Sequence, residues 1–193
     1  VHPVAIVSGV KPEEITFALS RSQGYVFRAL DAVSGLSLRS LSYLALTGGG
    51  GDPLSTTGDG ARVVDRGPVE PDATGLFRLD SLQPGVYRLV LGGQGIATMT
   101  LPAVVVPGRE ATYTFTAGGT LQVSVPGLSG NETAKMVLLD PQGQPVHATP
   151  FSHQPVLTLR AGGPSVLREI PAGSWRLRAS LPGGVIVEHP VTI

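Results

Sequence analysis

The feature that most constrains the fold of this chain is an internal repeat. Residues 82–89 read LQPGVYRL, and residues 170–177 read IPAGSWRL. Both segments place a glycine three residues after an aliphatic residue, and both end in an aromatic residue followed by Arg-Leu. The two glycines are 173 − 85 = 88 residues apart. Self-similarity at a fixed spacing predicts a chain built from repeated structural units.

The residues that follow each glycine alternate between apolar and polar side chains. Tyr87 and Leu89 flank Arg88 in the first copy, and the same alternation runs from Trp175 to Ser180 in the second. A period of two predicts a β-strand with one buried face. We therefore expect Tyr87 and Trp175 in the core and the arginines on a solvated outer face. The 26 glycines and 17 prolines lie between short apolar runs, which is typical of an all-β protein.

Further copies of the pattern indicate where the units begin and end. The alternation at 15–19, ITFAL, resembles the one at 111–116, and VSG at 7–9 resembles VPG at 106–108, with a spacing of 106 − 7 = 99. Residues 1–20 are therefore expected to be either the tail of a preceding repeat or a donor strand. The expected units are an N-terminal strand segment (1–20), a first β-sandwich (21–117) and a second β-sandwich that lacks its last strand (118–193).

Motifs in the first unit resemble a known family. Residues 72–79 read DATGLFRL, residues 82–87 read LQPGVY, and the turn LDAVSG at 30–35 follows an expected first strand at 25–29. Together they resemble the carboxypeptidase regulatory-like domain. The resemblance implies a small Greek-key β-sandwich, so the expected fold is all-β with two tandem prealbumin-like (transthyretin-like) or Ig-like sandwiches. In tandem, domains of this family serve as stalks, spacers, adhesive modules or filament subunits.

The composition argues against several classes of function. Fourteen basic and fourteen acidic residues give a formal net charge of zero, whereas a nucleic-acid-binding surface requires an excess of positive charge. No apolar run approaches the ~20 residues of a membrane-spanning helix. The absence of cysteine excludes disulfides and thiolate metal sites. The chain contains neither G-x-S-x-G nor H-E-x-x-H, so we expect no enzymatic activity and no cofactor.

The glycine-rich segment 47–71 is a candidate ligand-binding loop. It is longer than most connections in a compact domain, and carboxylates in such a loop can bind calcium, which takes oxygen ligands. Their spacing does not match the D-x-[DN]-x-[DN]-G calcium loop, so a solvated loop is the simpler interpretation. The candidate calcium ligands are Asp52, Asp59, Asp65 and Asp72.

These observations favour a non-catalytic structural module of a secreted or cell-surface protein, such as a stalk, an adhesive repeat or a filament subunit. A sandwich without its last strand exposes backbone groups that act as a template for another strand, and head-to-tail strand addition yields a filament. We expect Ile15, Phe17 and Leu19 to be the inserted anchors, with Val191 and Ile193 at the same interface. The partner is then a second copy or a neighbouring repeat. The alternative is a carbohydrate- or calcium-binding accessory module of a secreted enzyme.

Overall fold

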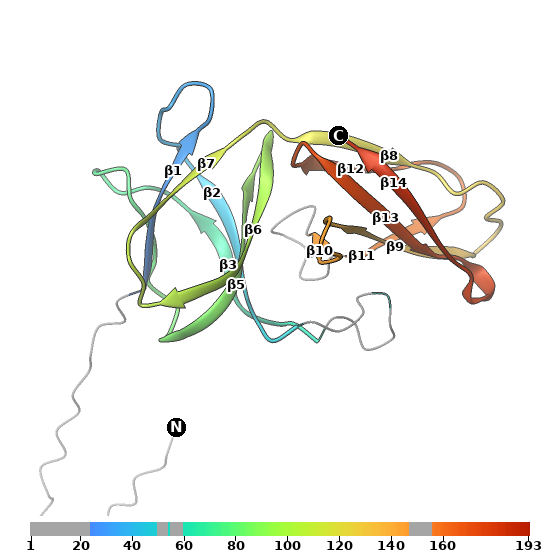
Figure 1. The fold of residues 1–193 in the computed structure, drawn as a ribbon, viewed down its shortest axis with the longest axis horizontal. Coiled ribbons are helices and arrows are strands. Elements are labelled where there is room, and N and C mark those ends of the chain that lie inside the picture. The colour runs from blue at the N-terminus through green and yellow to red at the C-terminus, as the bar shows by residue number, and fades with distance from the viewer. Residues whose placement is uncertain (1–23, 50–53, 55–59, 147–155) are drawn as a thin grey trace, which may run out of the picture.

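The computed structural model describes residues 24–49, 54, 60–146 and 156–193. These residues form an all-β structure, as the sequence predicts, and the one helical element among them is a 3₁₀ turn at Pro182–Gly184. Strands β1–β7 make one pair of sheets and strands β8–β14 make another (Figure 1). The two pairs lie side by side along the long axis of the molecule. The predicted N-terminal segment 1–20 lies outside the described residues.

The first pair of sheets, which we call the first sandwich, is closed by a parallel pair of strands. One sheet has the order β4-β1-β7 and the other β3-β2-β5-β6. Every pairing is antiparallel except that of β1 with β7, which runs in parallel from Phe27 opposite Ala111 to Asp31 opposite Phe115. The strands are β1 (Tyr25–Asp31), β2 (Leu41–Thr47), β3 (Arg62–Val69), β4 (Phe77–Leu79), β5 (Gly85–Gly93), β6 (Ile96–Val106) and β7 (Ala111–Phe115).

The core of the first sandwich consists of the alternating apolar residues of its strands. Phe27 of β1 and Phe77 of β4 are stacked with ring centroids 5.3 Å apart, and Phe115 of β7 is buried in the same cluster. Tyr87 and Leu89 of β5 join this cluster from the facing sheet, which confirms the alternation predicted for that strand. Full burial of a large apolar side chain contributes about 1.5–3 kcal/mol, so this layer holds the two sheets together.

The second pair of sheets, the second sandwich, has a smaller core. Strand β8 pairs only with β12 among the described strands, while β9 pairs with β10, β11 and β13, and β13 also pairs with β14. Its buried cluster is Ala134, Met136, Leu159 and Ala179. The strands are β8 (Gly119–Val123), β9 (Thr133–Leu139), β10 (Pro145–Val146), β11 (Val156–Arg160), β12 (Ser165–Ile170), β13 (Ser174–Ser180) and β14 (Ile186–Thr192).

The sequence repeat corresponds to a repeated local structure. Strands β5 and β13 each begin at or just after the repeated glycine and pair with the strand that follows them, β6 or β14. The Tyr87 hydroxyl donates to the carbonyl of Gln83 at 2.8 Å. The Trp175 indole Nε1–H donates to the carbonyl of Pro171 at 3.0 Å. In both units the aromatic side chain therefore folds back on the carbonyl four residues earlier and fixes the turn that precedes the strand.

Two details differ from the sequence-based expectations. The segment 47–71, expected to be one long loop, contains strand β3, so Asp65 lies in a strand. Val90 of β5 is buried with Leu44 on the outer face of the four-stranded sheet. That face was expected to be solvated from the position of Arg88, and part of it is instead a second, small apolar cluster.

The connection between the two sandwiches is itself hydrogen-bonded. Next to the β5–β6 hairpin, the Ala97 N–H donates to the Thr116 carbonyl at 2.8 Å and the Gly118 N–H donates to the Gly95 carbonyl at 3.1 Å. From the second sandwich, the Glu169 carboxylate accepts a hydrogen bond from the Gly95 N–H at 3.3 Å. We call this set of contacts the junction.

The junction requires glycine at position 118 because two backbone segments touch there. A Cβ atom on Gly118 would lie 2.4 Å from the Cα atom of Glu169. Glu169 interrupts the regular register of β12 with β8, and its φ of 61° is in the left-handed region. Both contacting groups are backbone, so neither can move aside in the way that the end of a flexible side chain can.

Replacing Gly118 with alanine is therefore expected to lower the free energy of unfolding by about 1–3 kcal/mol, because the added methyl group overpacks the contact. Gly163→Ala is the matched control, since a Cβ atom there meets nothing within 4 Å. Denaturant unfolding of both variants measures the difference. Equal stability of the two variants would contradict a tightly packed junction.

Candidate functional site

The described candidate calcium ligands make hydrogen bonds within the protein. Asp52 and Asp59 lie outside the described residues. The Asp65 carboxylate accepts hydrogen bonds from the hydroxyls of Tyr43, at 2.7 Å, and Ser81. Partial burial opposes the ionisation of Asp65, but the hydrogen bonds from Ser81 and Tyr43 outweigh it and lower the pKa. Among the residues that the structure describes, no group of three or more His, Asp or Glu side chains could hold a metal ion.

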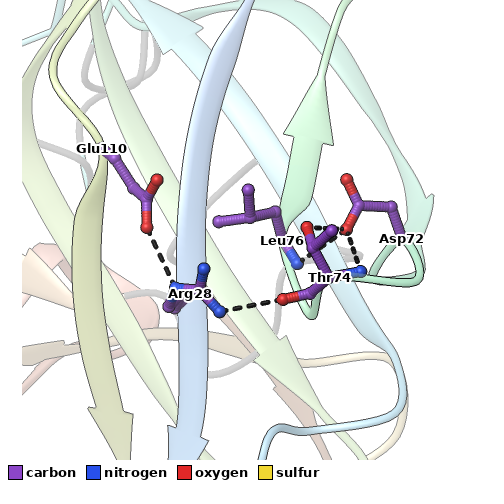
Figure 2. Close-up of polar contacts among 5 residues, drawn as sticks. All are labelled: Arg28, Asp72, Thr74, Leu76 and Glu110. Carbon is purple, nitrogen blue, oxygen red and sulfur yellow. Dashed lines mark hydrogen bonds and ion pairs between the residues drawn. The ribbon is translucent and has the colours of Figure 1, made fainter.

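Asp72 closes the turn between β3 and β4. Its Oδ1 atom accepts hydrogen bonds from the N–H groups of Thr74, at 2.8 Å, and Leu76, at 3.1 Å (Figure 2). Its Oδ2 atom accepts a hydrogen bond from Arg78 Nε at 3.0 Å. The Thr74 hydroxyl also donates to Oδ1. This bond, followed by the others, holds the pKa of Asp72 far below its usual range. The carboxylate is thus a structural cap of the turn.

Because the folded protein lowers the pKa of Asp72, the stability that this carboxylate contributes is present above the unfolded pKa of about 3.9 and is lost as the pH falls below it. Asp72→Ala is expected to lower the thermal midpoint at neutral pH and to flatten its decline in acid. Asp80→Ala, in the same sandwich, is the control. Thermal unfolding as a function of pH checks this, and identical acid profiles for all three proteins would contradict it.

Arg28 of β1 binds to the segments on both sides of its strand. Its Nη1 atom donates to the carbonyl of Thr74 at 2.9 Å, and its Nε atom donates to Glu110, just before β7, at 3.0 Å (Figure 2). The Arg28–Glu110 ion pair is exposed, so it contributes roughly 0.2–1 kcal/mol. Glu110 directly precedes Ala111, which lies opposite Phe27, so the ion pair lies at the start of the β1–β7 ladder.

An open groove of about 580 Å³ runs between the two sheets of the second sandwich. One wall is β8 with the residues that follow it, and the other wall is β13 with β14. His189 is the one ionisable side chain among the described lining residues, and most of the others are apolar. The lining residues are Leu121, Gln122, Val123, Ser124, Val125, Pro126, Leu159, Leu177, Ala179, Leu181, Val187, His189 and Val191.

The groove lies where the first sandwich has strand β7. Strand β8 pairs with β12 as β1 pairs with β4, with Leu121 opposite Leu167 in one case and Tyr25 opposite Leu79 in the other. On its other edge β1 pairs with β7, whereas no described strand pairs with the other edge of β8. Within the described residues, the second sandwich therefore has no strand equivalent to β7.

Side chains next to the groove are less buried than their equivalents in the first sandwich. Tyr25 and Phe27 are buried, whereas the equivalent Leu121 and Val123 alternate in the same way but are only half-buried.

Strand β13, which forms part of the opposite wall, also carries a side chain that is less buried than its equivalent in the first sandwich. Trp175 is half-buried, whereas the equivalent Tyr87 is buried, so the two aromatics that we expected in the core differ in how far they are buried. Val191 lies opposite Trp175 in the β13–β14 ladder and lines the groove. The backbone of Ile193 continues this pairing just beyond β14. The other predicted interface residues, Ile15, Phe17 and Leu19, lie outside the described residues.

The chemistry of the groove suits an added β-strand. It combines a row of half-buried apolar side chains with a strand edge whose backbone groups have no described strand partner. Backbone hydrogen bonds along such an edge, with alternate side chains in the apolar space, are the two components of β-strand addition.

No protein-family model and no curated protein matches the sequence. The chain is similar to solved structures at low identity: the Bacillus anthracis TIE protein (15% identity, TM-score 0.30, 90% of this chain and 31% of that one) and the Streptococcus agalactiae minor pilin GBS52 (13%, 0.36, 89% and 90%). It is also similar to the Corynebacterium diphtheriae major pilin SpaD (12%, 0.32, 91% and 65%). The chain thus spans less than a third of the TIE protein. At these TM-scores the likeness carries no argument about function.

Among the described residues there is no helix of the length and hydropathy needed to cross a membrane.

Proposed function

We propose that this chain is a non-catalytic structural module of a secreted or cell-surface protein, acting as a stalk, an adhesive repeat or a filament subunit, and that a partner completes its second sandwich by adding a β-strand. The observation that supports this is the open groove beside β8, at the position that β7 fills in the first sandwich. The tandem arrangement of sandwiches, the neutral net charge and the absence of a catalytic motif agree with it.

Two unfavourable features of the open groove support the addition of a strand: an unpaired strand edge and apolar side chains that are only half-buried. An unpaired strand edge is a template for further pairing, and apolar side chains left half-exposed forfeit part of the roughly 25 cal/mol per Å² that burial provides. A strand laid parallel to β8 pairs the edge and covers the apolar row at once. The lining from Leu121 to Pro126 corresponds to about 20 Å of extended chain, which fits a strand of ordinary length.

The alternative, a calcium- or carbohydrate-binding accessory module, has less support. Asp65 and Asp72 are occupied by hydrogen bonds within their own sandwich. Aromatic side chains commonly stack on sugar rings, but Trp175 and Tyr87 each donate a hydrogen bond to a carbonyl of their own turn.

Filling the groove within one chain tests the proposal. Residues 106–117, VPGREATYTFTA, would be appended after Ile193, so that a copy of β7 follows β14 much as β7 follows β6. We expect the free energy of unfolding to rise by about 2 kcal/mol or more, because several half-exposed apolar side chains become buried. Trp175 is the single tryptophan, and its fluorescence is expected to shift to shorter wavelength as the groove is covered.

The control is the same extension with aspartate in place of the appended copies of Tyr113 and Phe115. It has the same length and can still offer backbone groups, but it places charge in the apolar groove. If both extensions leave stability and Trp175 fluorescence unchanged, the groove does not accept a strand and the proposal is wrong.

A further inference from the structure

We infer that the strand that fills the groove is residues 14–20 of a second copy of this chain, inserted parallel to β8. The inference rests on the proposed function, because it names the partner of the same groove. It goes further because it assigns the donor segment, its register and the head-to-tail geometry of the assembly.

The donor segment has the same alternation as β7 and the glutamate before it, and two of the six aligned residues are identical. Residues 14–19 read EITFAL, and residues 110–115 read EATYTF, at a spacing of 110 − 14 = 96. Phe17 corresponds to Tyr113, and Leu19 corresponds to Phe115, which is buried in the first sandwich. The distance to the next strand also agrees, since 25 − 19 = 6 and 121 − 115 = 6.

The register follows from the equivalence of β8 with β1. Ala111 lies opposite Phe27 in the parallel β1–β7 ladder. The same spacing of 96 places Ile15 opposite Val123 and Phe17 opposite Val125. Both of these valines line the groove, so the apolar face of the donor strand would point into it.

The same chain cannot supply this strand to its own groove. Because β1 and β7 are parallel, Tyr25 lies at the end of β1 that is away from the junction, about 20 Å from it along the strand. Strand β8 lies on the far side of the junction from β1 (Figure 1), and residues of β8 form one wall of the groove. The six residue steps from Leu19 to Tyr25 span at most about 21 Å, which is too short to cover both lengths. Residues 14–20 of a second copy are not limited by this reach, so we place the donor strand on a second copy.

The β13–β14 hairpin of the second sandwich resembles the β5–β6 hairpin that forms part of the junction. Gly95 in the β5–β6 hairpin accepts the hydrogen bond from Gly118 and has a φ of 77°. At a spacing of 183 − 95 = 88, Gly183 in the β13–β14 hairpin has a φ of 81°, and a Cβ atom there would meet nothing within 4 Å. Donation would place residues 20–22 of the incoming copy beside this hairpin. Two copies would then be joined as the two sandwiches of one chain are joined.

Self-association of the full chain tests the donor assignment. We expect the wild-type chain to form concentration-dependent linear oligomers, measured by light scattering and sedimentation velocity. A chain with Phe17→Asp and Leu19→Asp is expected to associate at least about 100-fold more weakly. The reason is that two apolar side chains of the donor strand, which would enter the groove, become charged. A chain with Thr16→Asp and Ala18→Asp is the matched control, since it adds the same charge to the opposite face of the strand and should still associate.

Mixing two blocked chains provides a sharper test. The chain extended with residues 106–117 has its groove filled but keeps its donor segment, and the Phe17→Asp, Leu19→Asp chain has an open groove but no functional donor. Neither should oligomerise alone, and together they should form a dimer that grows no further. Larger oligomers in the mixture, or no dimer, would overturn the donor assignment.

A gain of affinity tests the register. Arg28 pairs with Glu110 where β7 lies against β1, but the position equivalent to Arg28 in the second sandwich is Ser124, because 28 + 96 = 124. Ser124→Arg would face Glu14 of the incoming copy and is expected to strengthen association roughly two- to fivefold at low salt. Adding Glu14→Gln should remove the gain. No gain from Ser124→Arg would contradict the register.

The results separate this inference from the proposed function. If the appended copy of β7 stabilises the chain but the wild-type chain is monomeric at every concentration, the groove accepts a strand and residues 14–20 are not its source. If the appended copy has no effect, the proposed function itself is wrong.

Discussion

The structure depends on the parallel pairing of the first and last strands of a sandwich. All other pairings in the first sandwich are antiparallel. The β1–β7 ladder is parallel and joins segments more than eighty residues apart in the sequence. It places Phe115 in the same core as Phe27 and closes one side of the apolar layer. Where this pairing exists, the core is sealed. In the second sandwich, where no described strand occupies the equivalent position, the same alternating side chains line an open groove.

The junction shows how one sandwich can be attached to the next with little freedom. The connection is held by hydrogen bonds to a glycine hairpin on one side and is packed against the backbone of Glu169 on the other. Only glycine fits at position 118 without displacing a backbone segment. The contacts described at the junction are therefore local ones, made around a six-residue step from Phe115 to Leu121.

Much of the fold could be predicted from local sequence. The alternation of apolar residues identified β5, β7 and β13, and the family resemblance indicated β1. The Asp-to-Gly motifs at 72–75 and 140–143 form turns closed by their aspartates. Strand β3 escaped prediction because it carries Gly67 and Pro68, which an edge strand tolerates. The Arg28–Glu110 pair joins residues 82 positions apart, and no local sequence pattern predicts it. The groove could be anticipated only as a missing strand, since the half-burial of Trp175 depends on tertiary packing.

The parallel β1–β7 ladder also has a mechanical consequence. The chain enters the first sandwich at the start of β1 and leaves it at the end of β7, and these points lie at opposite ends of two adjacent parallel strands. Tension along the chain would therefore load the five paired positions of this ladder in shear, so that their hydrogen bonds must fail together. An arrangement that opened them one after another would yield at a much lower force. A strand donated to β8 in the same sense would place each contact between copies under the same shear loading, so that resistance to pulling would be uniform along the assembly.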